Sequence, residues 1–175
     1  MKAPEDIIKL TDCICFHETD LPYGRGGSPI QNLIARGHKH TKISALKMSN
    51  QIDEGPIYLK KYLSLEGLGD DIFIRAAKTI GEMIKIIITE NLKPSNQRGE
   101  AEVFYRRTES QSEISPEIKS LNGLFDHIRM FDIETYPKAY INIGEFRYEL
   151  SRPALKTNEI IADIKITKIN KDSSD

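Results

Sequence analysis

Residues 13–55 decide the fold and read CICFHETDLPYGRGGSPIQNLIARGHKHTKISALKMSNQIDEG. An apolar strand over 13–16 ends at His17, and a loop rich in glycine and proline follows over 21–27. A later loop carries Asp53. The segment therefore predicts a histidine at a strand end and a distant loop carboxylate, a pair suited to acyl-transfer chemistry at neutral pH.

Helices and strands alternate around this loop. Pro29 begins a helix that Gly37 ends, with Ser28 as its expected N-cap. Residues 41–48 alternate as a strand, and 57–63 are rich in β-branched and aromatic residues. Strands alternating with helices in the first 92 residues favour an α/β fold with a partial parallel, Rossmann-like sheet and flanking helices.

The remaining pattern adds one long helix and a smaller C-terminal part. A broad apolar stripe predicts a helix from Asp70 or Asp71 to about residue 91. The later elements are expected as a strand over 103–105, a helix over 116–131, a hairpin over 140–150 and a final strand over 160–169. We expect a core over 1–95, a linker over 96–115, a small α+β extension over 116–170 and a disordered tail over 171–175.

Composition bounds the function classes. The net charge of the 175-residue chain is −1, which gives no basic field for DNA or an anionic membrane. No apolar run approaches the ~20 residues that span a bilayer. Cys13 and Cys15 are expected to be reduced thiols, which favours a cytoplasmic protein.

The ordered residues of this segment resemble the folate-dependent formyltransferases. That family's pattern runs Asn-x-His, a hydroxyl residue, Leu-Pro, Arg-Gly and Pro-Ile, then Thr, Met and Leu-Asp-x-Gly. The matching residues here are His17, Thr19, Leu21, Pro22, Arg25, Gly26, Pro29, Ile30, Gln31, Thr41, Met48, Asp53 and Gly55. The family members include enzymes that act on methionyl-tRNA and on nucleotide-linked amino sugars. The chain begins close to the Asn-x-His strand, so the resemblance implies a member without the N-terminal part of the catalytic domain.

The resemblance implies formyl transfer from 10-formyltetrahydrofolate, a co-substrate, to a primary amine, with no metal. His17 would stabilise the oxyanion and Asp53 would hold the imidazole charged. Cys15 stands at the family's asparagine position, where a thiol is a weaker hydrogen-bond donor. The folate-binding residues would be Leu21, Pro22, Met48, Ser49 and Asn50, and the substrate-binding residues Thr19, Arg25, Gly26 and Gly27.

A nucleotide-linked amino sugar is the acceptor that charge favours over tRNA. Residues 116–175 hold nine basic and ten acidic residues, which offers little attraction to a polyanion. The sequence also leaves open whether the chain forms a homodimer. Two alternatives stay beside the enzyme. One is a catalytically impaired remnant that binds folate or a partner chain, and the other is a structural zinc site of Cys13, Cys15 and His17 with His38 or His40.

Overall fold

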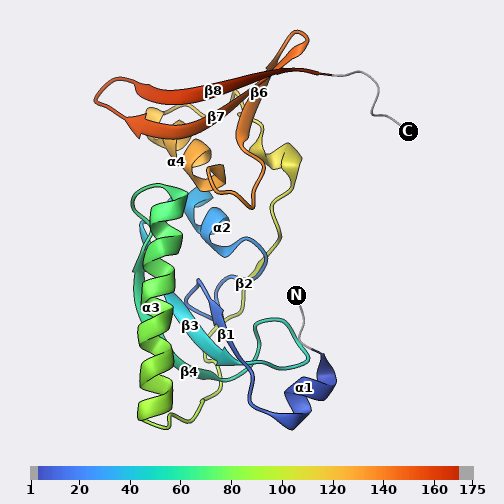
Figure 1. Ribbon diagram of the computed structural model, residues 1–175, viewed down its shortest axis with the longest axis vertical. Coiled ribbons are helices and arrows are strands. Elements are labelled where there is room, and N and C mark those ends of the chain that lie inside the picture. Colours follow the sequence, from blue (N-terminus) through green and yellow to red (C-terminus); the bar gives the residue numbers. More distant parts are fainter. Residues whose placement is uncertain (1–3, 170–175) are drawn as a thin grey trace. The chain divides into compact units, whose positions relative to one another are not determined.

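The computed structural model describes residues 4–169, in which helices and strands alternate (Figure 1). In chain order the elements are α1 Glu5–Leu10, β1 Ile14–His17, β2 Arg25–Gly26, α2 Pro29–Ala35, β3 His40–Lys47, β4 Ile57–Ser64, α3 Gly69–Thr89, β5 Val103–Phe104, the 3-10 helix η1 Glu109–Ser112, α4 Leu121–Phe131, β6 Ala139–Ile143, β7 Phe146–Leu155 and β8 Ile160–Lys168. The contacts divide the described chain into two units, residues 4–66 with 71–106 and residues 67–70 with 107–169. The predicted α/β class is confirmed.

The first unit is built on a three-stranded sheet in the order β1-β3-β4, whose strands pair antiparallel. The sequence pattern predicted parallel strands here, and the register explains the difference. His17, the last residue of β1, pairs with Ser44 in the middle of β3. The loop and α2 therefore continue beyond the end of β1, and β3 runs back along it. Parallel pairing between named strands of the described chain is confined to the short β2 and β5.

Helix α3 covers one face of this sheet (Figure 1). Its buried side chains recur at helical spacing, at Ile72, Ala76, Met83 and Ile87. The buried stripe is narrower than the sequence suggested, because Ile88 on the same helix is 72% exposed. The ends of α3 and β1 border an apolar groove of about 240 Å³, lined by Asp12, Ile14, Phe16, Ile84, Ile87 and Ile88.

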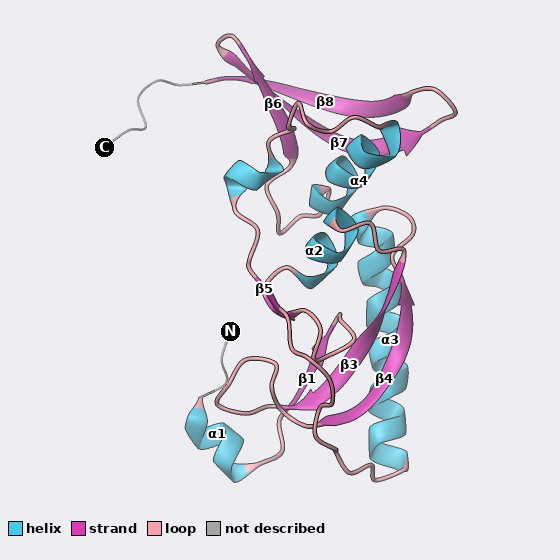
Figure 2. Ribbon diagram, turned by 180° about the vertical axis from the view of Figure 1, so that it is seen from behind, coloured by secondary structure: helices cyan, strands magenta, loops and turns pink. Residues whose placement is uncertain are grey.

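A second, smaller pairing closes the glycine loop. Strand β2 lies parallel to β5, with Arg25 opposite Val103 and Gly26 opposite Phe104 (Figure 2). The main-chain N–H groups of Gly24 and Arg25 both donate to the carbonyl oxygen of Glu102, at 3.0 and 2.9 Å. Residues almost eighty positions apart in sequence are thus fixed side by side.

The second unit packs α4 against the antiparallel sheet β6-β7-β8. The predicted hairpin is confirmed, with Gly144 at φ 60° in its turn. The helix expected from residue 116 begins only at Leu121, because the Ser120 side chain accepts a hydrogen bond from the Gly123 N–H at 3.0 Å and caps it there. Ile128, Phe131 and Ala139 are each 0% exposed and form the core of this unit.

Within residues 4–169, no helix combines the length and the apolar character needed to cross a membrane. The tail expected over 171–175 lies outside the described residues.

Candidate functional site

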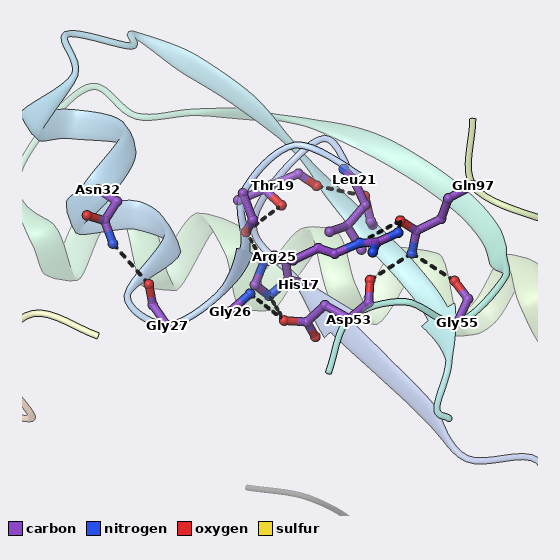
Figure 3. A network of polar contacts seen from close by, with 12 residues as sticks. His17, Thr19, Leu21, Arg25, Gly26, Gly27, Asn32, Asp53, Gly55 and Gln97 are labelled. Carbon is purple, nitrogen blue, oxygen red and sulfur yellow. Dashed lines mark hydrogen bonds and ion pairs between the residues drawn. The ribbon is translucent and has the colours of Figure 1, made fainter. Parts of the chain in front are cut away.

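The centre of the site is His17, at the carboxyl end of β1. Its side chain is buried, and its Nε2 lies 2.7 Å from the carbonyl oxygen of Gly24. Because a carbonyl oxygen only accepts, Nε2 carries the hydrogen in this bond. The other ring nitrogen, Nδ1, faces Oδ2 of Asp53 at 3.6 Å (Figure 3). The two contacts thereby fix the plane of the imidazole and turn Nδ1 toward a carboxylate.

Asp53, like His17, is fixed by a hydrogen bond to the main chain. Its Oδ2 accepts a hydrogen bond from the Gly26 N–H at 2.9 Å, and its backbone is left-handed at φ 56°. The neighbouring Gly55 lies so close to the β3 strand that a Cβ would stand 1.7 Å from the carbonyl oxygen of Lys47. The glycine is therefore needed for the loop to turn back against β3. Asp53 is placed by backbone geometry rather than by its own packing.

Gln97 ties the two loops of the site together. Its Nε2 donates to the carbonyl oxygens of Asp53 at 2.7 Å and Gly55 at 2.9 Å. Its Oε1 accepts from Nε and a terminal nitrogen of Arg25, at 3.2 and 2.9 Å. Another terminal nitrogen of Arg25 pairs with Glu54 at 3.0 Å. Arg25 thus bridges the glycine loop and the Asp53 loop (Figure 3).

The glycine loop is shaped by close approach to β5. A Cβ on Gly26, at φ 101°, would stand 2.4 Å from the carbonyl oxygen of Phe104, and one on Gly27 would stand 2.6 Å from the nitrogen of Arg106. Side chains are excluded at both positions, so the backbone of β5 can lie directly on the loop. This contact presents the Gly26 N–H to Asp53.

The other predicted site residues divide between core and surface. Thr19 and Leu21 are 0% and 1% exposed, and Pro22, joined to Leu21 by a cis peptide bond, is also buried. Ser49 and Asn50 are exposed on the loop after β3, and Met48 before them is half-buried. The structure brings His17, Asp53, Arg25, Gly26 and Gly27 together, while Ser49 and Asn50 lie out on their loop.

Cys15 lies two residues before His17 on β1 and is half-buried. Burial raises the pKa of its thiol, and the negative charges of Asp53 and Glu18 raise it further. Burial also raises the pKa of the Glu18 carboxyl, against the effect of the nearby His17. Cys15 therefore stays a neutral thiol at physiological pH. It can offer a weak hydrogen bond there, but no charge.

The zinc alternative has no ligand set in the described part of the chain. No group of three histidine, cysteine or acidic side chains gathers there with the geometry to hold a metal ion. His38 instead contacts the Tyr23 hydroxyl, and His40 stacks on Tyr62. The ring of His17 is already engaged by Gly24 and Asp53.

Sequence reasoning missed Gln97, which makes more side-chain hydrogen bonds in the site than any of the predicted residues. It lies 44 residues after Asp53 in a polar loop, where glutamine is ordinary. No local pattern marks it.

Comparisons with known proteins agree with the resemblance. Residues 109–167 match the family described as methionyl-tRNA formyltransferase, C-terminal domain. The methionyl-tRNA formyltransferase of Mesoplasma florum is 31% identical over 168 residues, which covers 91% of this chain and 53% of that protein. The chain spans about half the length of the curated relatives it matches.

Solved structures extend the agreement. A methionyl-tRNA formyltransferase from Clostridium thermocellum is 49% identical with a TM-score of 0.91, covering 94% of this chain and 73% of that one. A 4-N formyltransferase from Francisella tularensis shares the fold, with a TM-score of 0.63, 17% identity, and coverage of 81% of this chain and 61% of that one. This chain belongs to the family of formyltransferases that includes the methionyl-tRNA formyltransferases.

Proposed function

We propose that this chain carries the reaction centre for transfer of a formyl group from 10-formyltetrahydrofolate to a primary amine. The observation that carries the proposal is the fixed pair of His17 Nδ1 and Asp53 Oδ2, 3.6 Å apart and both largely withdrawn from water. A buried imidazole beside a buried carboxylate can hold a positive charge where an oxyanion develops.

In the proposed reaction the acceptor amine attacks the formyl carbon, and a C–N bond forms while the carbonyl oxygen becomes negative. His17, whose two ring nitrogens face Gly24 and Asp53, stabilises that oxygen through the positive charge of the imidazolium rather than through a hydrogen bond of its own. Asp53 takes the proton that the attacking amine must lose. Collapse of the adduct re-forms the carbonyl and breaks the bond from the formyl carbon to the folate nitrogen, and the proton held by Asp53 passes to that nitrogen.

Cys15 sets the expected rate. Loss of one good oxyanion donor typically costs about 100- to 1,000-fold in rate. The thiol at position 15 is neutral and a weak donor, so the proposed enzyme is slow unless another donor contributes. The substitution Cys15→Asn is expected to preserve or raise the activity.

We propose methionyl-tRNA as the first acceptor to test and an amino sugar as the second. The match of residues 109–167 to a methionyl-tRNA formyltransferase domain supports tRNA. The balanced charge of residues 116–175, nine basic against ten acidic, supports the smaller acceptor. Methionyl-tRNA is therefore placed before the amino sugar, whereas the charge of residues 116–175 alone had favoured the amino sugar.

The test mixes the chain with 10-formyltetrahydrofolate and each acceptor, and follows the formylated product. His17→Ala and Asp53→Asn are each expected to remove at least about 99% of the activity, in line with the usual effect of removing a general acid or base. Asp6→Asn, an exposed residue of α1, serves as the charge-matched control and is expected to keep full activity. Turnover that survives His17→Ala would refute the assignment.

The rival proposal is a chain that binds folate or a partner without turnover. It is favoured by the thiol at position 15, which is neutral and a weak hydrogen-bond donor. Under this rival, product is absent for wild type and for Cys15→Asn alike, while tetrahydrofolate still binds in calorimetry. Product formation by either protein excludes it.

A further inference from the structure

A second concave site lies on the first unit, on the side of α2 and the β3-β4 hairpin. Its volume is about 290 Å³, and it is lined by Asp20, Tyr23, Leu33, His38, His40, Thr41, Lys42 and Tyr62. None of these residues takes part in the His17–Asp53 contacts. Four of the eight lining side chains carry planar rings.

The rings form two separate walls. In one pair His40 and Tyr62 stack, with centroids 5.8 Å apart and planes inclined by 26°. In the other pair the Tyr23 hydroxyl lies 3.2 Å from Nε2 of His38. Tyr62 is 65% exposed although it is a large ring, so its face is open to a ligand.

The Tyr23 wall is rigid. Its ring meets Phe104 edge to face, with centroids 5.3 Å apart, and its hydroxyl accepts a hydrogen bond from Arg36 at 3.2 Å. The guanidinium of Arg36 in turn lies over the Phe104 ring, 4.5 Å from its centroid. A wall that is already fixed loses little conformational entropy when a flat group packs on it.

The charged residues at the rim are Asp20 and Lys42, and Lys60 approaches Asp20 from outside the lining. Asp20 is paired with two lysines, with Lys42 at 2.9 Å and Lys60 at 2.5 Å. Burial alone would raise the pKa of the Asp20 carboxyl, but the hydrogen bonds from Lys60 and Lys42 outweigh it and lower that pKa. One carboxylate therefore faces two ammonium groups, so this cluster of three residues carries one net positive charge, which attracts an anion to the rim.

We propose that this hollow binds a nucleoside monophosphate. The base packs on the open face of Tyr62 and against the Tyr23 wall, and the phosphate pairs with Lys42. Bases stack on aromatic side chains whatever their sequence identity, so the site selects for a planar ring with an adjoining anion. The volume is close to the ~300 Å³ lower bound of ligand pockets, which suits a single nucleotide. The inference goes beyond the proposed formyl transfer and does not rest on it.

Four histidines make the test direct, because two of them line the hollow. AMP is titrated into the whole chain while the histidine ring protons are followed by NMR. We expect the signals of His38 and His40 to shift from the ring current of the base, and those of His127 to stay. Ribose 5-phosphate, which has the phosphate but no base, is expected to bind at least about tenfold more weakly.

Matched variants locate the binding. Tyr62→Ala should weaken AMP at least about tenfold, whereas Tyr105→Ala, which removes an 82% exposed tyrosine of the same unit, should leave it unchanged. Lys42→Gln should weaken AMP more than it weakens adenosine. Equal binding of AMP and ribose 5-phosphate, no binding of either, or full binding by Tyr62→Ala would each overturn the proposal.

A further variant separates this site from the proposed reaction. His17→Ala is expected to abolish formyl transfer and to leave the AMP titration unchanged. Loss of AMP binding in His17→Ala would place the nucleotide at the catalytic pair and refute a separate site. Absence of formyl transfer in wild type, with AMP binding intact, would end the proposed function alone.

Discussion

Removal of the Gln97 side chain should loosen the site while the side chains of His17 and Asp53, the two residues proposed for chemistry, stay unchanged in kind. In Gln97→Ala the carbonyl oxygens of Asp53 and Gly55 each lose a donor, and Arg25 loses the Gln97 acceptor while keeping Glu54. A neutral hydrogen bond contributes about 1 kcal/mol net, and one to a charged group about 1.5–3 kcal/mol. Because the side chain is only half-buried, water replaces part of this, and we expect a loss of about 2 kcal/mol in the free energy of unfolding.

Urea unfolding of the whole chain measures this loss. With a slope of about 1–3 kcal/mol per molar urea, the midpoint should fall by roughly 1 M. Hydrogen exchange gives a local readout, because the Gly26 N–H that donates to Asp53 should exchange faster once the loop is released. The matched control is Gln51→Ala, an exposed glutamine two residues before Asp53. A Gln97→Ala midpoint equal to that of Gln51→Ala, with unchanged Gly26 exchange, would refute the reasoning.

Three further outcomes follow from single contacts. Gly55→Ala should destabilise the first unit strongly, because the added Cβ meets the Lys47 carbonyl oxygen. The measurement is the thermal midpoint, which should fall by a large amount, and a midpoint equal to that of the wild type would contradict this. Burial lowers the pKa of His127, so the unfolded chain binds the proton more readily than the folded one. The free energy of unfolding should therefore fall as the pH drops below about 6.5. Urea unfolding measures this decrease, which should be absent in His127→Phe. The raised pKa of Cys15 predicts that iodoacetamide labels it slowly at pH 8, read by peptide mass spectrometry; rapid labelling there would argue against the burial.

The sequence predicted the helices and strands better than it predicted their pairing. Helix α3 and the β6-β7 hairpin were evident because each carries a local signal, an apolar stripe in one and a turn glycine in the other. The direction of β3 carries no such signal. It depends on how far the chain travels after His17, which is fixed by the glycine loop packing on β5.

The convergence of His17 and Asp53 was predicted from the family pattern and is found at 3.6 Å. The support around the pair could not be predicted in the same way. Gln97 reaches the site through tertiary contacts alone, and Leu21, expected beside a ligand, is 1% exposed and packs in the core. A sequence motif gives the types of the site residues and their order along the chain, whereas the burial of each side chain depends on the whole fold.

Residues 97–106, which run along the loops of the first unit, limit where chimeras between related formyltransferases can be joined. Gln97, Glu102 and Phe104 all bond to loops of the first unit, so a crossover point placed soon after α3 would splice foreign residues onto the glycine loop. A chimera joined beyond Arg106 keeps every one of those bonds native. The best junction for exchanging the C-terminal part is therefore after Arg106, seventeen residues beyond Thr89, where the last helix of the first unit ends.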